Sequence, residues 1–186
     1  MDTWFTADTH FNHDLIRKYC HRPFDTCQEM DEIMIANWNN KIKPGDIVYH
    51  LGDFAFGKED AVKKYRNRLM GKIHLILGNH DYKNKIHRLT NIFSSVRDLL
   101  EIKYNHQRLI LCHYNMRTWN ASHFNSYQLH GHSHGTLAPT GKQLDVGVDV
   151  NNFSPVHIDQ IMKIMLMKPD NFNYISQEER EREKDE

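Results

Sequence analysis

Five short polar motifs, each directly after an apolar run typical of a β-strand, constrain the fold of this chain more than any other feature. The apolar runs are residues 3–7, 47–51, 73–77, 109–111 and 127–129. In an open α/β sheet, the loops at the carboxyl ends of the strands share one edge, and ligands bind along that edge. We therefore expect polar side chains from distant parts of the sequence to meet at one site.

The motifs contain seven side chains of the kinds that bind metal ions: Asp8, His10, Asp53, Asn79, His113, His132 and His134. A single ion with a position open to water needs only about three protein ligands, so this set is too large for one ion. It suits two ions that share a carboxylate, a centre that can hold both the attacking and the leaving oxygens of a phosphoryl displacement. Oxygen and imidazole ligands without a thiolate indicate manganese, iron, zinc or nickel.

The order D-x-H, G-D, G-N-H-D, H and G-H-x-H resembles the calcineurin-like metallophosphoesterase superfamily, in particular its small bacterial and phage single-domain members. The resemblance covers roughly residues 3–168 and implies a four-layer αββα sandwich of two mixed β-sheets flanked by helices. It also implies two metal positions. Asp8, His10 and His134 would hold one ion, Asn79, His113 and His132 would hold the other, and Asp53 would bridge them.

The resemblance further implies catalytic roles for Asp53, His80 and Asp81. His80 would contact the scissile phosphate and either protonate the leaving oxygen or stabilise its charge. Asp81 would orient His80. The cofactors implied are two divalent transition-metal ions, with Mn²⁺ preferred and Fe, Zn or Ni as alternatives.

Four side chains near the first motif are candidates for substrate contact: Asn12, His13, Arg17 and Arg22. Asn12 and His13 could face a phosphate or could cap a helix beginning near Asp14. Arg17 and Arg22 could contact a second phosphate through the planar guanidinium fork, or could be ordinary surface cations.

Length and charge indicate a single domain over residues 1–175, followed by a charged tail, 176–186, that we expect to be a frayed helix end or disordered. The 24 basic residues balance the 24 acidic ones, so no global field attracts long duplex nucleic acid. The three cysteines are interpreted as reduced thiols. With no signal peptide and no apolar run long enough to span a membrane, we expect a cytoplasmic protein without membrane contact.

Sequence patterns also predict individual elements. Thr26 and Glu29 form a capping-box pattern that opens a helix ending near Asn40. We expect a polar helix over residues 59–69, a hairpin pairing residues 96–104 with 108–112, and a strand over residues 144–150. A final helix is expected to begin at Pro155.

The leading hypothesis is a phosphoesterase that hydrolyses small phosphodiesters, such as cyclic or short nucleotides, by attack of a metal-bound hydroxide with His80 assisting the leaving group. A nuclease or a nucleotide pyrophosphohydrolase with the same centre is one alternative. A non-catalytic protein-binding scaffold of the same fold is another, disfavoured because His80 and all seven ligands are present. The expected partner is a small phosphate ester, and the oligomeric state is left open.

Overall fold

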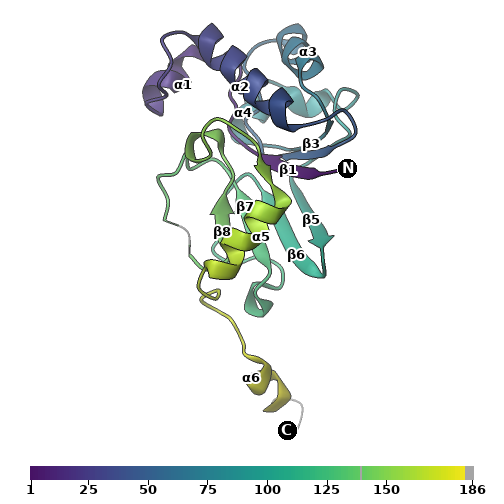
Figure 1. Cartoon of the computed structure of the whole chain (residues 1–186), viewed down its shortest axis with the longest axis vertical. Coiled ribbons are helices and arrows are strands. Elements are labelled where there is room, and N and C mark those ends of the chain that lie inside the picture. Colours follow the sequence, from purple (N-terminus) through teal and green to yellow (C-terminus); the bar gives the residue numbers. More distant parts are fainter. Residues whose placement is uncertain (139, 183–186) are drawn as a thin grey trace.

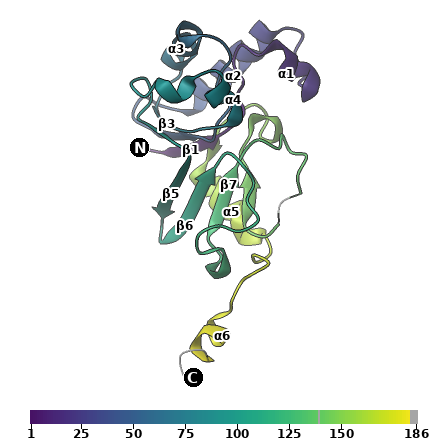
Figure 2. The ribbon, with the colours of Figure 1, turned by 180° about the vertical axis from the view of Figure 1, so that it is seen from behind.

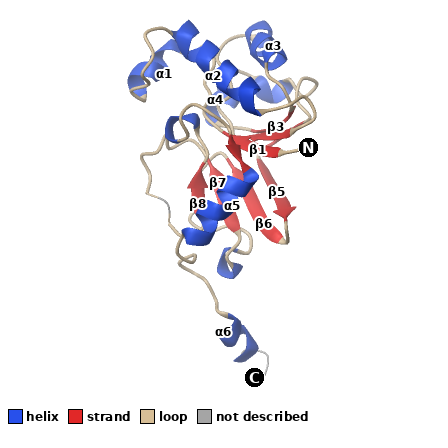
Figure 3. Ribbon diagram, viewed as in Figure 1, coloured by secondary structure: helices blue, strands red, loops and turns tan. Residues whose placement is uncertain are grey.

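Two β-sheets form the centre of the protein, which the computed structural model describes over residues 1–138 and 140–182 (Figure 1, Figure 3). The first sheet has the strand order β4-β3-β2-β1-β9, and the second has the order β5-β6-β7-β8. The strands of the first sheet are β1 (Thr3–Thr6), β2 (Ile47–His50), β3 (Lys72–Ile76), β4 (Ser95–Arg97) and β9 (Val156–His157). The strands of the second are β5 (Leu99–Tyr104), β6 (Gln107–Cys112), β7 (Tyr127–His130) and β8 (Gln143–Asp145).

Both sheets mix parallel and antiparallel pairs. In the first sheet β9 is antiparallel to β1, and every other pair is parallel. In the second sheet β5 is antiparallel to β6, and the remaining pairs are parallel. Because β1, β2 and β3 are parallel neighbours, their carboxyl ends lie at one edge, where the first three motifs begin.

Helices α1 (Asp14–Tyr19), α2 (Cys27–Lys41), α3 (Glu59–Arg68) and α4 (Asn79–Lys83) lie on the side of the first sheet away from the second (Figure 1). Their apolar side chains and the outer face of the first sheet form one core, in which Met34 and Trp38 of α2 pack with Val48 and Ile73. The short 3₁₀ helix η1 (Ile86–Arg88) follows α4.

A second core fills the space between the sheets, where Phe5 and Leu51 pack with Leu109 and Leu129. Helix α5 (Ile158–Met167) contributes buried side chains to this core and contacts β1, β9 and β8, so it joins the two sheets at one side. The opposite face of the second sheet is covered by residues 114–126, which include η2 (Ser122–Phe124), and Gln128 Nε2 donates to the Tyr114 carbonyl there at 2.8 Å. The predicted fold, two mixed sheets flanked by helices, is confirmed.

Three predicted boundaries are wrong. The predicted strand 96–104 is interrupted at Asp98, and its two halves, β4 and β5, belong to different sheets. The predicted strand 144–150 ends at Asp145 and continues as the 3₁₀ helix η3 (Val148–Val150). The last predicted helix begins at Ile158 instead of Pro155, because residues 156–157 first pair with β1.

The predicted capping box of α2 is half confirmed. Thr26 Oγ1 accepts a hydrogen bond from the Glu29 amide at 3.0 Å. The Glu29 carboxylate, however, accepts from the Asp25 amide at 2.7 Å rather than from the amide of Thr26. In the described part of the chain, no helix has the length and apolarity needed to cross a membrane.

The charged tail includes α6 (Gln177–Arg182), which contains no buried residue and lies away from both sheets (Figure 2). Residues 183–186 of the predicted tail lie outside the described residues.

Candidate metal centre

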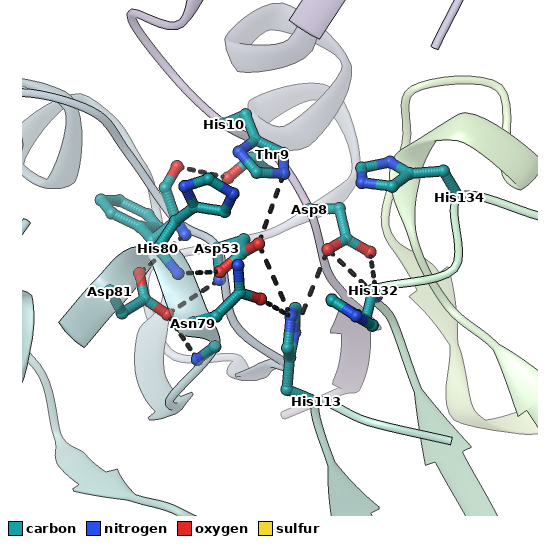
Figure 4. Close-up of polar contacts among 12 residues, drawn as sticks. Asp8, Thr9, His10, Asp53, Asn79, His80, Asp81, His113, His132 and His134 are labelled. Carbon is teal, nitrogen blue, oxygen red and sulfur yellow. Dashed lines mark hydrogen bonds and ion pairs between the residues drawn. The ribbon is translucent and has the colours of Figure 1, made fainter. Parts of the chain in front are cut away.

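The loops that follow five strands bring all seven predicted ligands together (Figure 4). Asp8 and His10 follow β1, Asp53 follows β2, and Asn79 opens α4 directly after β3. The second sheet contributes His113 at the end of β6 and the pair His132 and His134 after β7. The predicted convergence of these segments at one place is therefore observed.

Five of these seven residues have a left-handed backbone conformation. Their φ angles are +58° at Asp8, +48° at His10, +57° at Asp53, +66° at His132 and +46° at His134. This conformation is uncommon for residues other than glycine and typically persists where the surrounding structure enforces it. Here the amides of Asp8 and His10 donate to the carbonyls of Gly52 and Asp53, at 2.9 Å in both cases. The strained loops are thus held in place by each other.

Glycines allow the ligand loops to approach one another closely. A Cβ atom on Gly131 would lie 2.5 Å from Asp8 Oδ2, and one on Gly78 would collide with the Asp53 carboxylate. Any side chain at either position would displace a predicted ligand, which explains the glycine at the start of the third and fifth motifs.

The first ligand group consists of Asp8, His10 and His134, whose ligand atoms lie within 4.8 Å of one another. Asp8 is fully buried, and burial raises its pKa well above the usual range. Both ring nitrogens of His10 are buried without a hydrogen-bond partner, and burial lowers the pKa of this imidazole. Because unpaired buried nitrogens are costly, a metal ion between these side chains is a chemically fitting partner.

The second ligand group consists of Asp53, His113 and His132, again with ligand atoms within 4.8 Å. The Asn79 amide oxygen lies 3.2 Å from His113 Nε2, so Asn79 also faces this group. His113 Nδ1 donates to the Leu51 carbonyl at 2.7 Å, which directs its Nε2 toward Asp53. Burial lowers the pKa of His113 to about 4, so its imidazole is neutral and able to bind a metal.

Asp53 lies between the two groups. Its Oδ2 atom is 3.5 Å from Nε2 of His10 in the first group and 3.5 Å from Nε2 of His113 in the second. Its other oxygen accepts from the His80 amide at 2.9 Å. Burial, followed by the nearby Asp81 carboxylate, raises the pKa of Asp53 to about 7. This placement is the one that a bridging ligand requires.

Asp149 supports the first group, although the sequence did not single it out. Its Oδ2 atom is 2.7 Å from His134 Nδ1, which leaves the other ring nitrogen of His134 available as a ligand. Burial lowers the pKa of His134, but the hydrogen bonds to Asp149 and Cys20, together with the charges of Asp8 and Asp149, outweigh burial and raise this pKa to about 10. One feature of the sequence could have indicated this role: Asp149 is an acidic residue inside an apolar stretch, and a buried carboxylate needs a partner.

Two predicted substrate contacts are engaged elsewhere. Arg22 is 4% exposed, and its guanidinium donates to both Asp149 oxygens, at 2.7 and 2.9 Å, and to the carbonyls of Asp8 and Thr9. Arg17 donates to Asp14 and to the carbonyls of Phe24 and Asp25. Both guanidinium groups are thus occupied by protein partners. The prediction that Arg17 and Arg22 contact a substrate phosphate is therefore wrong.

Asp81 also differs from its predicted role. Its fully buried carboxylate accepts hydrogen bonds from the amides of Asp53, Phe54 and Gly78, at 2.8 to 2.9 Å. These contacts fix the loops of the second and third motifs to each other. Asp81 therefore positions the backbone around Asp53 and has no hydrogen bond to the His80 ring among the described residues.

His80 and His13 line the open side of the site. The His80 ring lies 5.2 Å from the His10 ring, and burial, followed by the charge of Lys83, lowers its pKa. The His13 ring stacks on Phe56 at 3.7 Å, and Phe56 in turn lies 5.0 Å from His80. Asn12 is exposed and donates from its side chain to the Phe56 carbonyl at 3.1 Å. His13 and His80 are thus placed beside the ligands, whereas the Asn12 amide is used to hold the loop.

No family model matches the sequence. The uncharacterized protein MJ1445 of Methanocaldococcus jannaschii is 36% identical to this chain over 171 residues, which cover 87% of the chain and 90% of that protein. The chain belongs to the same family as this archaeal protein. The relative's own function is uncharacterized, so membership of the family does not assign an activity.

Among solved structures, the protein of unknown function AQ665 from Aquifex aeolicus has the same fold, with a TM-score of 0.71 and 24% identity over 88% of this chain and 98% of that one. The E. coli phosphoesterase YfcE is more distant, with a TM-score of 0.41 and 20% identity over 79% of this chain and 76% of that one. The activity of this family member has to be inferred from the geometry of its site.

Proposed function

We propose that the protein is a phosphoesterase that uses a dinuclear metal centre to hydrolyse small phosphodiesters, such as cyclic or short nucleotides. The placement of Asp53 carries this proposal, because one carboxylate oxygen lies 3.5 Å from a histidine of each ligand group. Two divalent transition-metal ions fit the donor set, with manganese preferred over iron, zinc or nickel. When bound, such ions would polarise the phosphoryl oxygens and lower the pKa of a water molecule.

The protein's own residues would position the ligands and serve the leaving group. Asp81 holds the loop of Asp53, and the His80 amide fixes one oxygen of the same carboxylate. The His80 ring faces the ligand groups from the open side, so a phosphate placed there would have its leaving oxygen next to an imidazole. Such a group can donate a proton or a hydrogen bond to that oxygen. His13, stacked on Phe56, closes the neighbouring wall.

The structure favours an enzyme over a binding scaffold. A scaffold would have no need for two complete ligand groups, strained loops that converge, and a partly open histidine beside them. Buried His10 in particular has no hydrogen-bond partner for either ring nitrogen, a cost that a resident metal ion would offset.

The decisive experiment combines metal analysis with hydrolysis of bis(p-nitrophenyl) phosphate. Protein that is stripped with a chelator should have no hydrolytic activity. After reloading with Mn²⁺ it should contain two ions per chain and regain activity. Asp53→Asn should lose metal and activity together, whereas Asp60→Asn, at an exposed position on α3, should retain both. A single ion at saturating metal with undiminished activity would refute the dinuclear proposal.

Substrate size separates this proposal from the nuclease alternative. With 24 basic and 24 acidic residues, the chain lacks a global field for holding duplex DNA at physiological salt. We expect cyclic nucleotides and dinucleotides to be hydrolysed with a higher kcat/KM than duplex DNA. Duplex cleavage that has the higher kcat/KM and persists at high salt would favour a nuclease instead.

A further inference from the structure

A cleft of about 590 Å³ lies between the start of α3 and the segment from α4 to η1. Four cations line it: Lys58 at the start of α3, Lys83 at the end of α4, and Lys85 and Arg88 further along the chain. Its volume is sufficient for a nucleotide-sized group. The two helices lie on the same side of the first sheet (Figure 2).

The charge in this cleft is not neutralised by the protein. Across residues 1–138 and 140–182, none of the four cationic side chains makes an ion pair or a hydrogen bond, and all four residues are exposed. Glu59 also lines the cleft, but its carboxylate is paired with Lys63 Nζ at 2.6 Å. In a chain with zero formal net charge, this is a local accumulation of unpaired positive charge, the kind of surface that attracts an anion.

The cleft and the candidate metal centre share helix α4. Helix α4 carries Asn79 and His80 at its beginning and Lys83 at its end. Asn84 donates to the His80 carbonyl at 2.8 Å and accepts from the Gly57 amide at 3.4 Å, so it joins the site to the cleft wall. From residue 80 to residue 84 the helix rises by about 6 Å. An anion in the cleft and a phosphate beside His80 can therefore belong to one small molecule.

We propose that this cleft binds a second phosphate group of the substrate, on the His80 side of the scissile phosphodiester. The inference rests on the proposed function and specifies its substrate class, namely phosphodiesters that carry a further phosphate. Arg17 and Arg22, which the sequence offered for a second phosphate, are engaged by other partners, whereas the cleft cations are free. Short oligonucleotides with a phosphate end and those with a polyphosphate end both contain the required second phosphate.

The effect should be moderate and sensitive to salt. Hydrogen bonds between cations and phosphate are stronger than neutral ones, but exposed charges are screened by solvent and by salt. We therefore expect the second phosphate to increase kcat/KM by about tenfold at low ionic strength, which corresponds to about 1.4 kcal/mol. The advantage should shrink as salt is added.

The test compares the charge-reversed variant Lys85→Glu/Arg88→Glu with the control Lys103→Glu/Lys163→Glu, which changes the net charge equally at exposed positions on β5 and α5. Two pairs of substrates distinguish the sources of the phosphate. One pair is thymidylyl-thymidine with and without a terminal monophosphate, and the other is thymidylyl-thymidine with and without a terminal triphosphate.

In at least one pair, the wild-type protein should hydrolyse the substrate with the additional phosphate with an approximately tenfold higher kcat/KM than its counterpart. The cleft variant should lose that preference while hydrolysing bis(p-nitrophenyl) phosphate at the wild-type rate, and the control variant should behave as wild type. An advantage confined to the first pair would identify a phosphate end, and one confined to the second would identify a polyphosphate end. Equal kcat/KM values within both pairs would overturn the proposal.

Calorimetry with inorganic pyrophosphate, in the presence of a chelator, tests the cleft independently of catalysis. Wild-type protein should bind pyrophosphate, and the cleft variant should bind it at least about tenfold more weakly. A wild-type protein that does not bind pyrophosphate, or equal weakening in the control variant, would refute an anion site in the cleft. Pyrophosphate binding without hydrolysis of any ester would refute the phosphoesterase and retain the cleft as an anion site.

Discussion

Replacing Asp53 with asparagine should have opposite effects on the protein with and without metal. In the metal-free protein, the Asp53 carboxylate is 2% exposed, and burial and the Asp81 carboxylate raise its pKa more than the charge of His134 lowers it, so its ionised form is costly. Asparagine has a similar shape and keeps an oxygen to accept from the His80 amide, but it carries no charge. The metal-free Asp53→Asn protein should therefore be more stable than wild type where Asp53 is ionised, although the same change removes the bridging ligand.

The magnitude follows from the pKa of Asp53, which is about 7 in the folded protein and about 3.9 in an unfolded chain. Because folding raises this pKa, the protonated group contributes stability that is complete below about pH 4 and is lost as the pH rises through about 7. Between pH 6 and pH 8 that loss is about 1.4 kcal/mol. The free energy of unfolding of Asp53→Asn, relative to wild type, should increase by this amount over the same interval.

Urea unfolding in the presence of a chelator at pH 6, 7 and 8 measures this difference. The buried histidines are present in both proteins, so the difference between the two reports on Asp53 and on its coupling to the histidines around it. Asp60→Asn, at an exposed position on α3, serves as the control. A constant difference for Asp53→Asn across the three pH values would show that Asp53 is ionised throughout, and the reasoning from burial would be refuted.

Three further substitutions test single contacts. His80→Ala should keep both metal ions and lose about 10²–10⁴-fold in turnover, with a smaller loss for nitrophenyl esters; equal losses for good and poor leaving groups would show that His80 acts by binding phosphate. Asp149→Asn should weaken metal binding by about 10–100-fold in a metal titration, because it loosens the orientation of His134; unchanged affinity would exclude that role. Arg22→Met should lower the free energy of unfolding by about 3–5 kcal/mol, because it removes the guanidinium from the buried Asp149 carboxylate and leaves only His134 as a charged partner; a loss below about 1 kcal/mol in urea would contradict this account.

The convergence of the ligands could be predicted because it depends on local patterns. An apolar run followed by a short polar motif is visible in the sequence, and parallel strands bring such motifs to one edge regardless of their separation along the chain. Asp8 and Asp53 illustrate this, since their strands are neighbours in the first sheet with a regular parallel register. These patterns predict where the ligand side chains lie. They do not predict which metal ions bind, because the same ligand types suit several transition metals.

The errors arise where one local pattern fits two structures. Residues 144–150 alternate apolar with polar or glycine residues, which predicts a strand. In the structure Val146 and Val148 are indeed buried, but Asp145 and Asp149 bond to the loop of the fifth motif instead of facing solvent. Residues 96–104 show the same ambiguity, since nothing in their apolar pattern marks Asp98 as the point where the chain passes from one sheet to the other.

The predicted phosphate contacts of Arg17 and Arg22 are wrong for a different reason. Whether an arginine is free or paired depends on contacts between residues far apart in the sequence, and Arg22 is 127 positions from Asp149. Its spacing from the first motif made it a reasonable phosphate contact, yet burial excludes that role. The unpaired cations of the cleft, Lys85 and Arg88, are in turn inconspicuous in the sequence because they precede no motif.

The buried pair of Arg22 and Asp149 has a consequence for how the site binds metal. Asp149 holds His134 of the fifth motif, and Arg22 holds the carbonyls of Asp8 and Thr9 in the first. One ion pair therefore ties together the two loops that form the first ligand group, without any metal. Burying such a pair contributes little net stability compared with apolar packing, so its retention is better explained by the geometry that it fixes. Ligands held in position before binding lose less conformational freedom when the ion arrives, which strengthens metal binding.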